Sequence, residues 1–193
     1  MITSFSVSLT YLHTGKEPMF DNAPLQVVKE QPKNFTELET NTSISSDGSL
    51  VQFVDLPFVP IPARATFIEM AGDEKSYGSL GVFRVHYPPQ EIEGKRAVIL
   101  EINGDSMEPQ LKHGSKVLAV EVPKGDWVYQ AGKVYAIAFA NQFVTKRIKD
   151  NDMLINGTLT LHSDNPNGGK FVVPADQIRS MWRVIEVVKS TVE

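Results

Sequence analysis

The sequence AVILEINGDSMEPQL, residues 97–111, is the stretch from which the fold of this chain can be worked out. Its first residues are apolar or β-forming and predict a buried strand, which runs into a turn at Asn103-Gly104-Asp105. Ser106 follows directly, and Pro109 keeps Glu108 out of the helical region. A strand that ends in a glycine turn lifts the next side chain clear of the sheet, which is how a serine nucleophile is displayed. A serine in a turn is more often a solvated turn former than a nucleophile. The nucleophile interpretation of Ser106 therefore requires a base elsewhere in the sequence.

A candidate base lies 40 positions later, in FVTKRIK at residues 143–149. The period of two that a strand imposes places Lys146 on one face with Val144 and Ile148, so we expect that face to be buried. Burial lowers the pKa of a lysine, as proton transfer from serine near neutral pH requires. Arg147, on the opposite face, is expected to point to solvent. The alternative is that Lys146 snorkels from a sheet edge.

In combination, these blocks resemble a known family. The blocks are GDSMEP at 104–109, TKRI at 145–148, LHSDNPN at 161–167 and IRSMWRVIEVV at 178–188. Their order and spacing resemble the LexA and UmuD type of self-cleaving Ser-Lys peptidases over residues 54–188. The resemblance implies that Ser106 is the nucleophile and Lys146 the general base. Signal peptidases share GxSMxP and the Ser-Lys chemistry, but the SDNP block and the closing segment favour the LexA side.

Backbone N–H groups of the 104–107 turn are the predicted oxyanion donors, those of Ser106 and Met107 in particular. Asp105 and Glu108, which flank the serine, are interpreted as local hydrogen-bond formers without a role in proton transfer. The two-residue sequence Gly168-Gly169 precedes no helix start and predicts no phosphate site.

Composition is that of an ordinary soluble protein: 193 residues, 41% hydrophobic, 22% charged, with a net charge of −4. This balance does not favour nucleic-acid binding by the chain as a whole. The absence of cysteine excludes disulfides and thiolate metal sites, and it fits a reducing cytoplasm. Four scattered histidines have no metal-ligand spacing, so we expect no metal and no cofactor.

The chain divides, by its composition, into an extension at 1–50 and a peptidase-like domain at 51–193. Residues 1–12 lack the basic start of a signal peptide, and no apolar run is long enough to span a membrane. Residues 5–11 alternate like a short strand, and residues 24–31 have room for one short helix. The stretch 15–48 otherwise reads as a poorly structured linker. LexA-like repressors carry a helix-turn-helix domain here, and no such pattern is found, so the chain is either UmuD-like or a fragment or diverged form of a repressor.

The predicted fold is mainly β, a LexA or signal-peptidase-like folded sheet or barrel. Short strands are separated by Gly, Pro, Asn and Asp, and no long helical period occurs. Asn141-Gln142 and Asn156-Gly157 are the predicted hairpin turns. Besides 97–101, we expect strands at 64–70, 82–85, 116–121, 133–140, 143–149, 153–156, 159–162, 170–173 and 181–188. We interpret Trp127 and Trp182 as core or interface anchors.

The predicted substrate is the chain itself, cut between Ala71 and Gly72, which lies 35 residues before Ser106. Relatives cleave a bond between small residues at about this distance, and glycine allows close approach of the scissile carbonyl. Ala65-Thr66 is the competing register, where the β-branched Thr66 would crowd the cleft.

The resemblance also implies a homodimer, to which 181–188 is a candidate contributor, and a recombinase filament as trigger in a DNA-damage or repressor circuit. A different reading is a non-catalytic dimerisation module with the same fold.

Overall fold

The computed structural model describes residues 41–44, 50–69, 77, 80–86 and 89–189. The chain divides into two units, Met1–Gln31 and Pro32–Glu193, and every described residue belongs to the second. The strand expected at 5–11, the helix expected at 24–31 and the Ala71-Gly72 bond lie outside the described residues. No helix among the described residues is long and apolar enough to cross a membrane.

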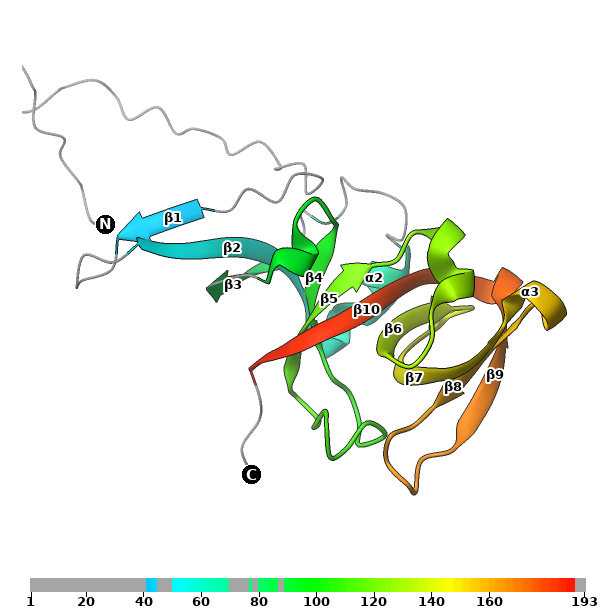
Figure 1. Ribbon diagram of the computed structural model, residues 1–193. Coiled ribbons are helices and arrows are strands. Elements are labelled where there is room, and N and C mark those ends of the chain that lie inside the picture. Colours follow the sequence, from blue (N-terminus) through cyan, green and yellow to red (C-terminus); the bar gives the residue numbers. More distant parts are fainter. Residues whose placement is uncertain (1–40, 45–49, 70–76, 78–79, 87–88, 190–193) are drawn as a thin grey trace, which may run out of the picture. The chain divides into compact units, whose positions relative to one another are not determined.

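The described part of the chain forms one sheet of ten strands, so the prediction of a mainly β folded sheet is confirmed. The strands follow the order β1-β2-β4-β5-β10-β6-β7-β8-β9, with β3 paired to β2 (Figure 1). Neighbours are antiparallel except β2 and β4, which are parallel. The strands are β1 (Asn41–Ile44), β2 (Leu50–Val59), β3 (Gly81–His86), β4 (Ala97–Glu101), β5 (Lys116–Glu121), β6 (Val134–Phe139), β7 (Gln142–Asp152), β8 (Thr158–His162), β9 (Lys170–Pro174) and β10 (Ile178–Lys189).

The last strand, β10, joins the two halves of the sheet. It pairs with β6 through its first half and with β5 through its second (Figure 1). Register shifts interrupt both pairings, between Ile178 and Ser180 and again between Val184 and Glu186. Such irregularities bend and twist a strand, so one strand can serve two differently oriented sets of partners.

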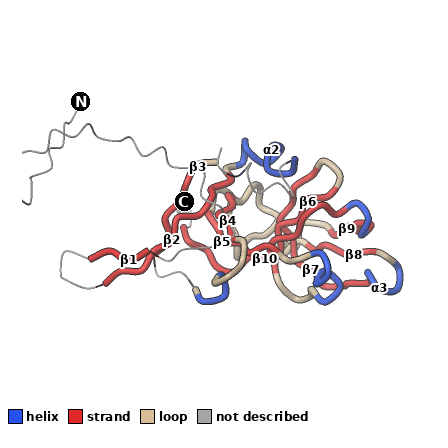
Figure 2. The backbone as a smooth tube through the Cα atoms, turned by 90° about the horizontal axis from the view of Figure 1, so that it is seen from above, coloured by secondary structure: helices blue, strands red, loops and turns tan. Residues whose placement is uncertain are grey.

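Helices are short in the described residues and lie at strand ends, not as a layer over the sheet (Figure 2). The two α-helices are α2 (Arg64–Glu69) and α3 (Met153–Asn156). The 3-10 turns are η1 (Ile61–Ala63), η3 (Gln90–Ile92), η4 (Lys124–Tyr129) and η5 (Ala175–Gln177).

The strand predicted at 64–70 is wrong, because residues 64–69 form α2. Phe67 and Ile68 are consecutive and both buried. A strand would point them to opposite faces, whereas a helix can turn both toward one core. Phe67 packs against the rings of Tyr77, Phe143 and Trp182 with centroids 5.7, 5.6 and 5.4 Å away.

The strand predicted at 153–156 is also wrong, because these residues form α3. Leu154 and Ile155 are 76% and 83% exposed, so their apolar character reflects no buried strand face. Gly157, with φ +64°, ends this helix and does not form a two-residue hairpin turn. The other predicted turn lies one residue earlier than expected, at Ala140 and Asn141, since β7 begins at Gln142.

Both tryptophans are core residues, as one of the sequence interpretations held. Trp127 is 5% exposed and donates its indole N–H to the Val122 carbonyl at 2.8 Å. Trp182 is 1% exposed, so its ring lies inside the protein and is not open to a partner subunit.

We expect Phe67→Ala to lower the free energy of unfolding by about 3–5 kcal/mol, because it empties the centre of an aromatic cluster. Urea denaturation of the purified chain measures the change. Thr66→Ala, one residue earlier and exposed, is the matched control and should change the stability by no more than about 0.5 kcal/mol. Equal effects of the two substitutions would show that α2 is not anchored as described.

Candidate functional site

The loop between β4 and β5, residues 102–115, carries Ser106. Hydrogen bonds from Ile102 N–H to Ser115 O (2.8 Å) and from Gly114 N–H to Ile102 O (2.9 Å) close the loop at its base. Met107, next to the serine, is 1% exposed and belongs to the core beneath. Ser106 itself is half-buried. The serine therefore stands on a loop that is fixed from below.

The turn before the serine has the geometry that the sequence predicted. Gly104 has φ +83°, a left-handed conformation that favours glycine, and its N–H donates to His113 Nδ1 at 3.1 Å. Glu108 N–H donates to Asp105 O at 2.9 Å, which closes a turn around Ser106. The Glu108–Pro109 peptide is cis. The N–H groups of Ser106 and Met107 donate to no acceptor among the described residues.

Lys146 lies in β7, and its ammonium donates to Ser163 Oγ at 2.7 Å. The hydroxyl of Ser163 in turn donates to Gly169 O at 2.9 Å, so its single hydrogen is already committed. Ser163 can therefore only accept from the lysine. One N–H of Lys146 Nζ is therefore fixed in direction by the Ser163 oxygen.

Burial lowers the pKa of Lys146 below its ordinary value of 10.5, and the carboxylate of Asp105 acts in the opposite direction. Ile148 on the same strand face is fully buried and Val144 packs against the same cluster, in accord with the face predicted from the sequence. Since Asp105 directly precedes Ser106, the charge that opposes the effect of burial on Lys146 belongs to the serine loop.

A turn after β8 connects the lysine and the serine loop. Ser163 receives the Lys146 N–H, and two residues later Asn165 contacts the loop twice. Its backbone N–H donates to Ser106 O and its side-chain Nδ2 to Asp105 O, both at 3.0 Å. Within the described residues, Ser106 Oγ and Lys146 Nζ do not hydrogen bond to each other. The structure brings the two predicted residues together through this turn.

Glycine at position 168 lets the turn close tightly. A Cβ atom there would lie 2.5 Å from Ser163 Cβ and 2.6 Å from Ser163 Oγ. Any other residue would thus displace the side chain that holds Lys146. No phosphate site was predicted at Gly168. Its close packing against Ser163 explains why a glycine is found at this position.

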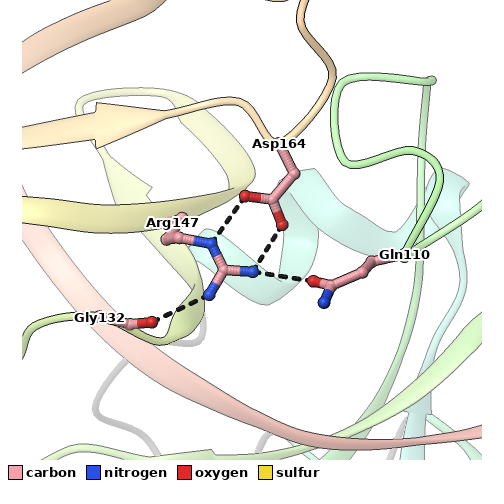
Figure 3. A network of polar contacts seen from close by, with 4 residues as sticks. All are labelled: Gln110, Gly132, Arg147 and Asp164. Atoms are coloured by element: carbon pink, nitrogen blue, oxygen red, sulfur yellow. Dashed lines mark hydrogen bonds and ion pairs between the residues drawn. The ribbon is translucent and has the colours of Figure 1, made fainter.

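Arg147 does not point to solvent, which corrects the prediction made from the strand period. Its guanidinium forms a two-pronged ion pair with Asp164, at 2.7 and 2.6 Å (Figure 3). It also donates to Gly132 O at 2.9 Å and to Gln110 Oε1 at 2.8 Å. The side chains of the pair are 21% and 14% exposed. The hydrogen bond with Asp164 raises the pKa of Arg147 further.

This network ties β7, the 163–169 turn and the end of the serine loop together (Figure 3). A strand period assigns a side chain to a face but does not show what packs against that face. The Ser163, Asn165 and Gln110 contacts were missed for the same reason. For Ser163 and Asn165 the sequence signal was the SDN block at 163–165, which entered only as part of the family resemblance, and Gln110 had no signal.

The competing cleavage register, Ala65-Thr66, lies within α2, where both residues are exposed. Both neighbours that follow, Phe67 and Ile68, are buried. No group of three or more metal-ligating side chains occurs among the described residues.

Comparison with known proteins gives one family. The Peptidase S24-like family matches residues 68–185, which is more than half of the chain and contains both Ser106 and Lys146. No curated protein gives a significant match to the chain.

We expect Asp105→Asn to lower the pKa of Lys146 further, because it removes a carboxylate whose charge favours the ammonium form. Titration of ¹³C-labelled lysine side chains by NMR measures the shift, with every variant made in the same Ser106→Ala background. Asp126→Asn removes an exposed carboxylate elsewhere and should leave the Lys146 pKa unchanged. An increase of the Lys146 pKa in the Asp105→Asn variant would contradict the described electrostatic influence of Asp105.

Proposed function

This chain belongs to the Peptidase S24-like family, and from that premise we propose that it is a serine endopeptidase with Ser106 as nucleophile and Lys146 as general base. The observation that carries the proposal is the 163–165 turn. It holds the desolvated lysine by Ser163 and the nucleophile loop by Asn165, two residues apart. A lysine buried for packing alone would not require that its neighbour in space also hold the serine backbone.

In the proposed reaction, neutral Lys146 Nζ takes the proton of Ser106 Oγ as the oxygen attacks the carbonyl carbon of the scissile peptide. The N–H groups of Ser106 and Met107 stabilise the oxyanion that forms. The Lys146 ammonium then gives its proton to the leaving nitrogen, the C–N bond breaks, and an ester on Ser106 remains. Water, deprotonated by Lys146, hydrolyses the ester and restores the serine.

Ser163 acts in this proposal as a positioning residue. It accepts one N–H of Lys146 at 2.7 Å and offers no hydrogen in return, because its own goes to Gly169 O. In neutral lysine the lone pair then points away from Ser163. That lone pair is left for the Ser106 hydroxyl, which makes no hydrogen bond to the described residues in this structure.

The proposed substrate is the Ala71-Gly72 bond of the chain itself. The bond lies in sequence between Phe67 and Tyr77, whose buried rings are in contact at 5.7 Å. The described residues that flank the bond in sequence, Phe67 and Tyr77, are thus both core residues. The alternative, Ala65-Thr66, would require unwinding α2, because a protease cleft takes extended backbone. Involvement in a repressor or DNA-damage circuit, with a recombinase filament as trigger, is proposed from the family resemblance.

We expect incubation of the chain at increasing pH to speed the appearance of a fragment that begins at Gly72, as the fraction of neutral Lys146 rises. Ser106→Ala should abolish the fragment, and Lys146→Met should slow its formation by about 10²–10⁴-fold. Lys149→Met, an exposed lysine of the same strand, is the matched control and should cleave normally. Intact mass and N-terminal sequencing give the rate and the bond.

Processing by the Ser106→Ala protein would refute the assigned nucleophile. A new N-terminus at Thr66 would move the cleavage site but keep the dyad. An intact wild-type chain at every pH, together with a stable dimer, would favour the non-catalytic module.

We expect Arg147→Gln and Asp164→Asn each to slow cleavage, because either leaves a poorly exposed charge without its partner. The double variant should recover part of the rate, with a coupling of about 0.5–3 kcal/mol between the two sites. The pH midpoint of cleavage should stay at its wild-type value in all three variants. The reason is that the ion pair positions the turn and is not among the causes of the lowered Lys146 pKa. Additive losses would show that the ion pair does not position the site.

A further inference from the structure

A cavity of about 690 Å³ lies over the junction of β5, β10 and β6, and the proposed catalytic residues do not line it. Its floor is a row of directly opposed residues in these strands: Val120, Arg183 and Tyr135. Residues 94–96 and the η4 turn with the segment that follows it form the walls. The volume is that of a typical small-molecule site.

The cavity is basic although the chain as a whole carries a net charge of −4. Arg96, which lines the cavity, is neutralised by Glu121, with Nη1 and Oε2 2.8 Å apart. The charged side chains that then remain in the lining are Lys95, Lys133 and Arg183 against the single carboxylate of Asp126. A local excess of positive charge in an acidic protein attracts anions to that place.

Arg183 is the cationic side chain on the cavity floor. It is half-buried on the cavity floor and makes no hydrogen bond or ion pair within the described part of the chain. Its charge reaches the phenol of Tyr135, where it opposes the rise in the Tyr135 pKa that burial causes. Guanidinium N–H groups removed from water favour an oxyanion that satisfies them in pairs.

We propose that this cavity binds a small organic anion that carries a carboxylate or a phosphate group. Arg183 and Lys133 hold the anionic group, and the rest of the molecule lies against the ring of Tyr129, which is 76% exposed at the cavity. Lys95, exposed in the segment 94–96, adds to the attraction. The site is independent of the proposed peptidase reaction.

The test titrates inorganic phosphate and, separately, citrate into the full-length Ser106→Ala chain, with sodium chloride at equal ionic strength as reference. Backbone amide NMR should show saturable shifts at residues 94–96, 120–122, 129–135 and 183 with at least one anion. Saturation by phosphate alone assigns a phosphate ligand, and saturation by citrate alone assigns a carboxylate ligand. Shifts no larger than those in sodium chloride would overturn the proposal.

Arg183→Gln should weaken the binding by ~10-fold or more, because it removes the fork that holds the anion. Arg179→Gln, an exposed arginine of the same strand outside the cavity, should bind like the parent chain. Circular dichroism checks that both variants fold. If Arg183→Gln does not fold, Lys133→Gln, at an exposed position, takes its place and should also weaken binding. Equal affinity of the cavity variant and of Arg179→Gln would refute the assigned site.

Discussion

The hydrogen bond between Lys146 Nζ and Ser163 Oγ is the contact around which the candidate site is built. It joins β7 to the turn after β8, and the same turn reaches the serine loop through Asn165. Three segments that are distant in sequence therefore meet at one place. Each is also held from behind: the loop by Met107 in the core, the turn by Gly168 against Ser163, and the strand by its neighbours β6 and β8.

Holding a desolvated lysine there costs stability. The folded-state pKa of Lys146 is lowered below the ordinary value of 10.5, so the unfolded chain binds more protons between these two pKa values. The contribution of this lysine to folding is thus most favourable above pH 10.5 and is lost as pH falls through the folded-state pKa. At neutral pH the lysine therefore lowers the free energy of unfolding. Packing in the core, including the aromatic cluster around Phe67 and Trp182, offsets this loss.

The Arg147–Asp164 pair shows how charge serves geometry in the same region. The pair is largely withdrawn from water, and such pairs contribute little net stability because desolvation offsets the attraction. Its fork-like geometry nevertheless fixes direction, since four donor contacts leave the guanidinium one orientation. Arg147 and Lys146 are adjacent in β7, so fixing one restrains the other.

The sequence by itself determined the mainly β class, eight of the strands, the glycine turn before Ser106 and the buried face of Lys146, because alternation and turn chemistry are local properties. It failed at 64–70 and 153–156, where short apolar runs carry no period that separates strand from helix. It also failed at 41–44, which the linker prediction for 15–48 included, because these mostly polar residues form β1 by pairing with β2. Only the tertiary structure decided which residues contact each functional side chain. The hydrogen bonds of Lys146 to Ser163 and of Arg147 to Asp164 join different segments, and no local pattern encodes them. The position of Arg183 on the floor of the cavity likewise depends on strands that are distant in sequence.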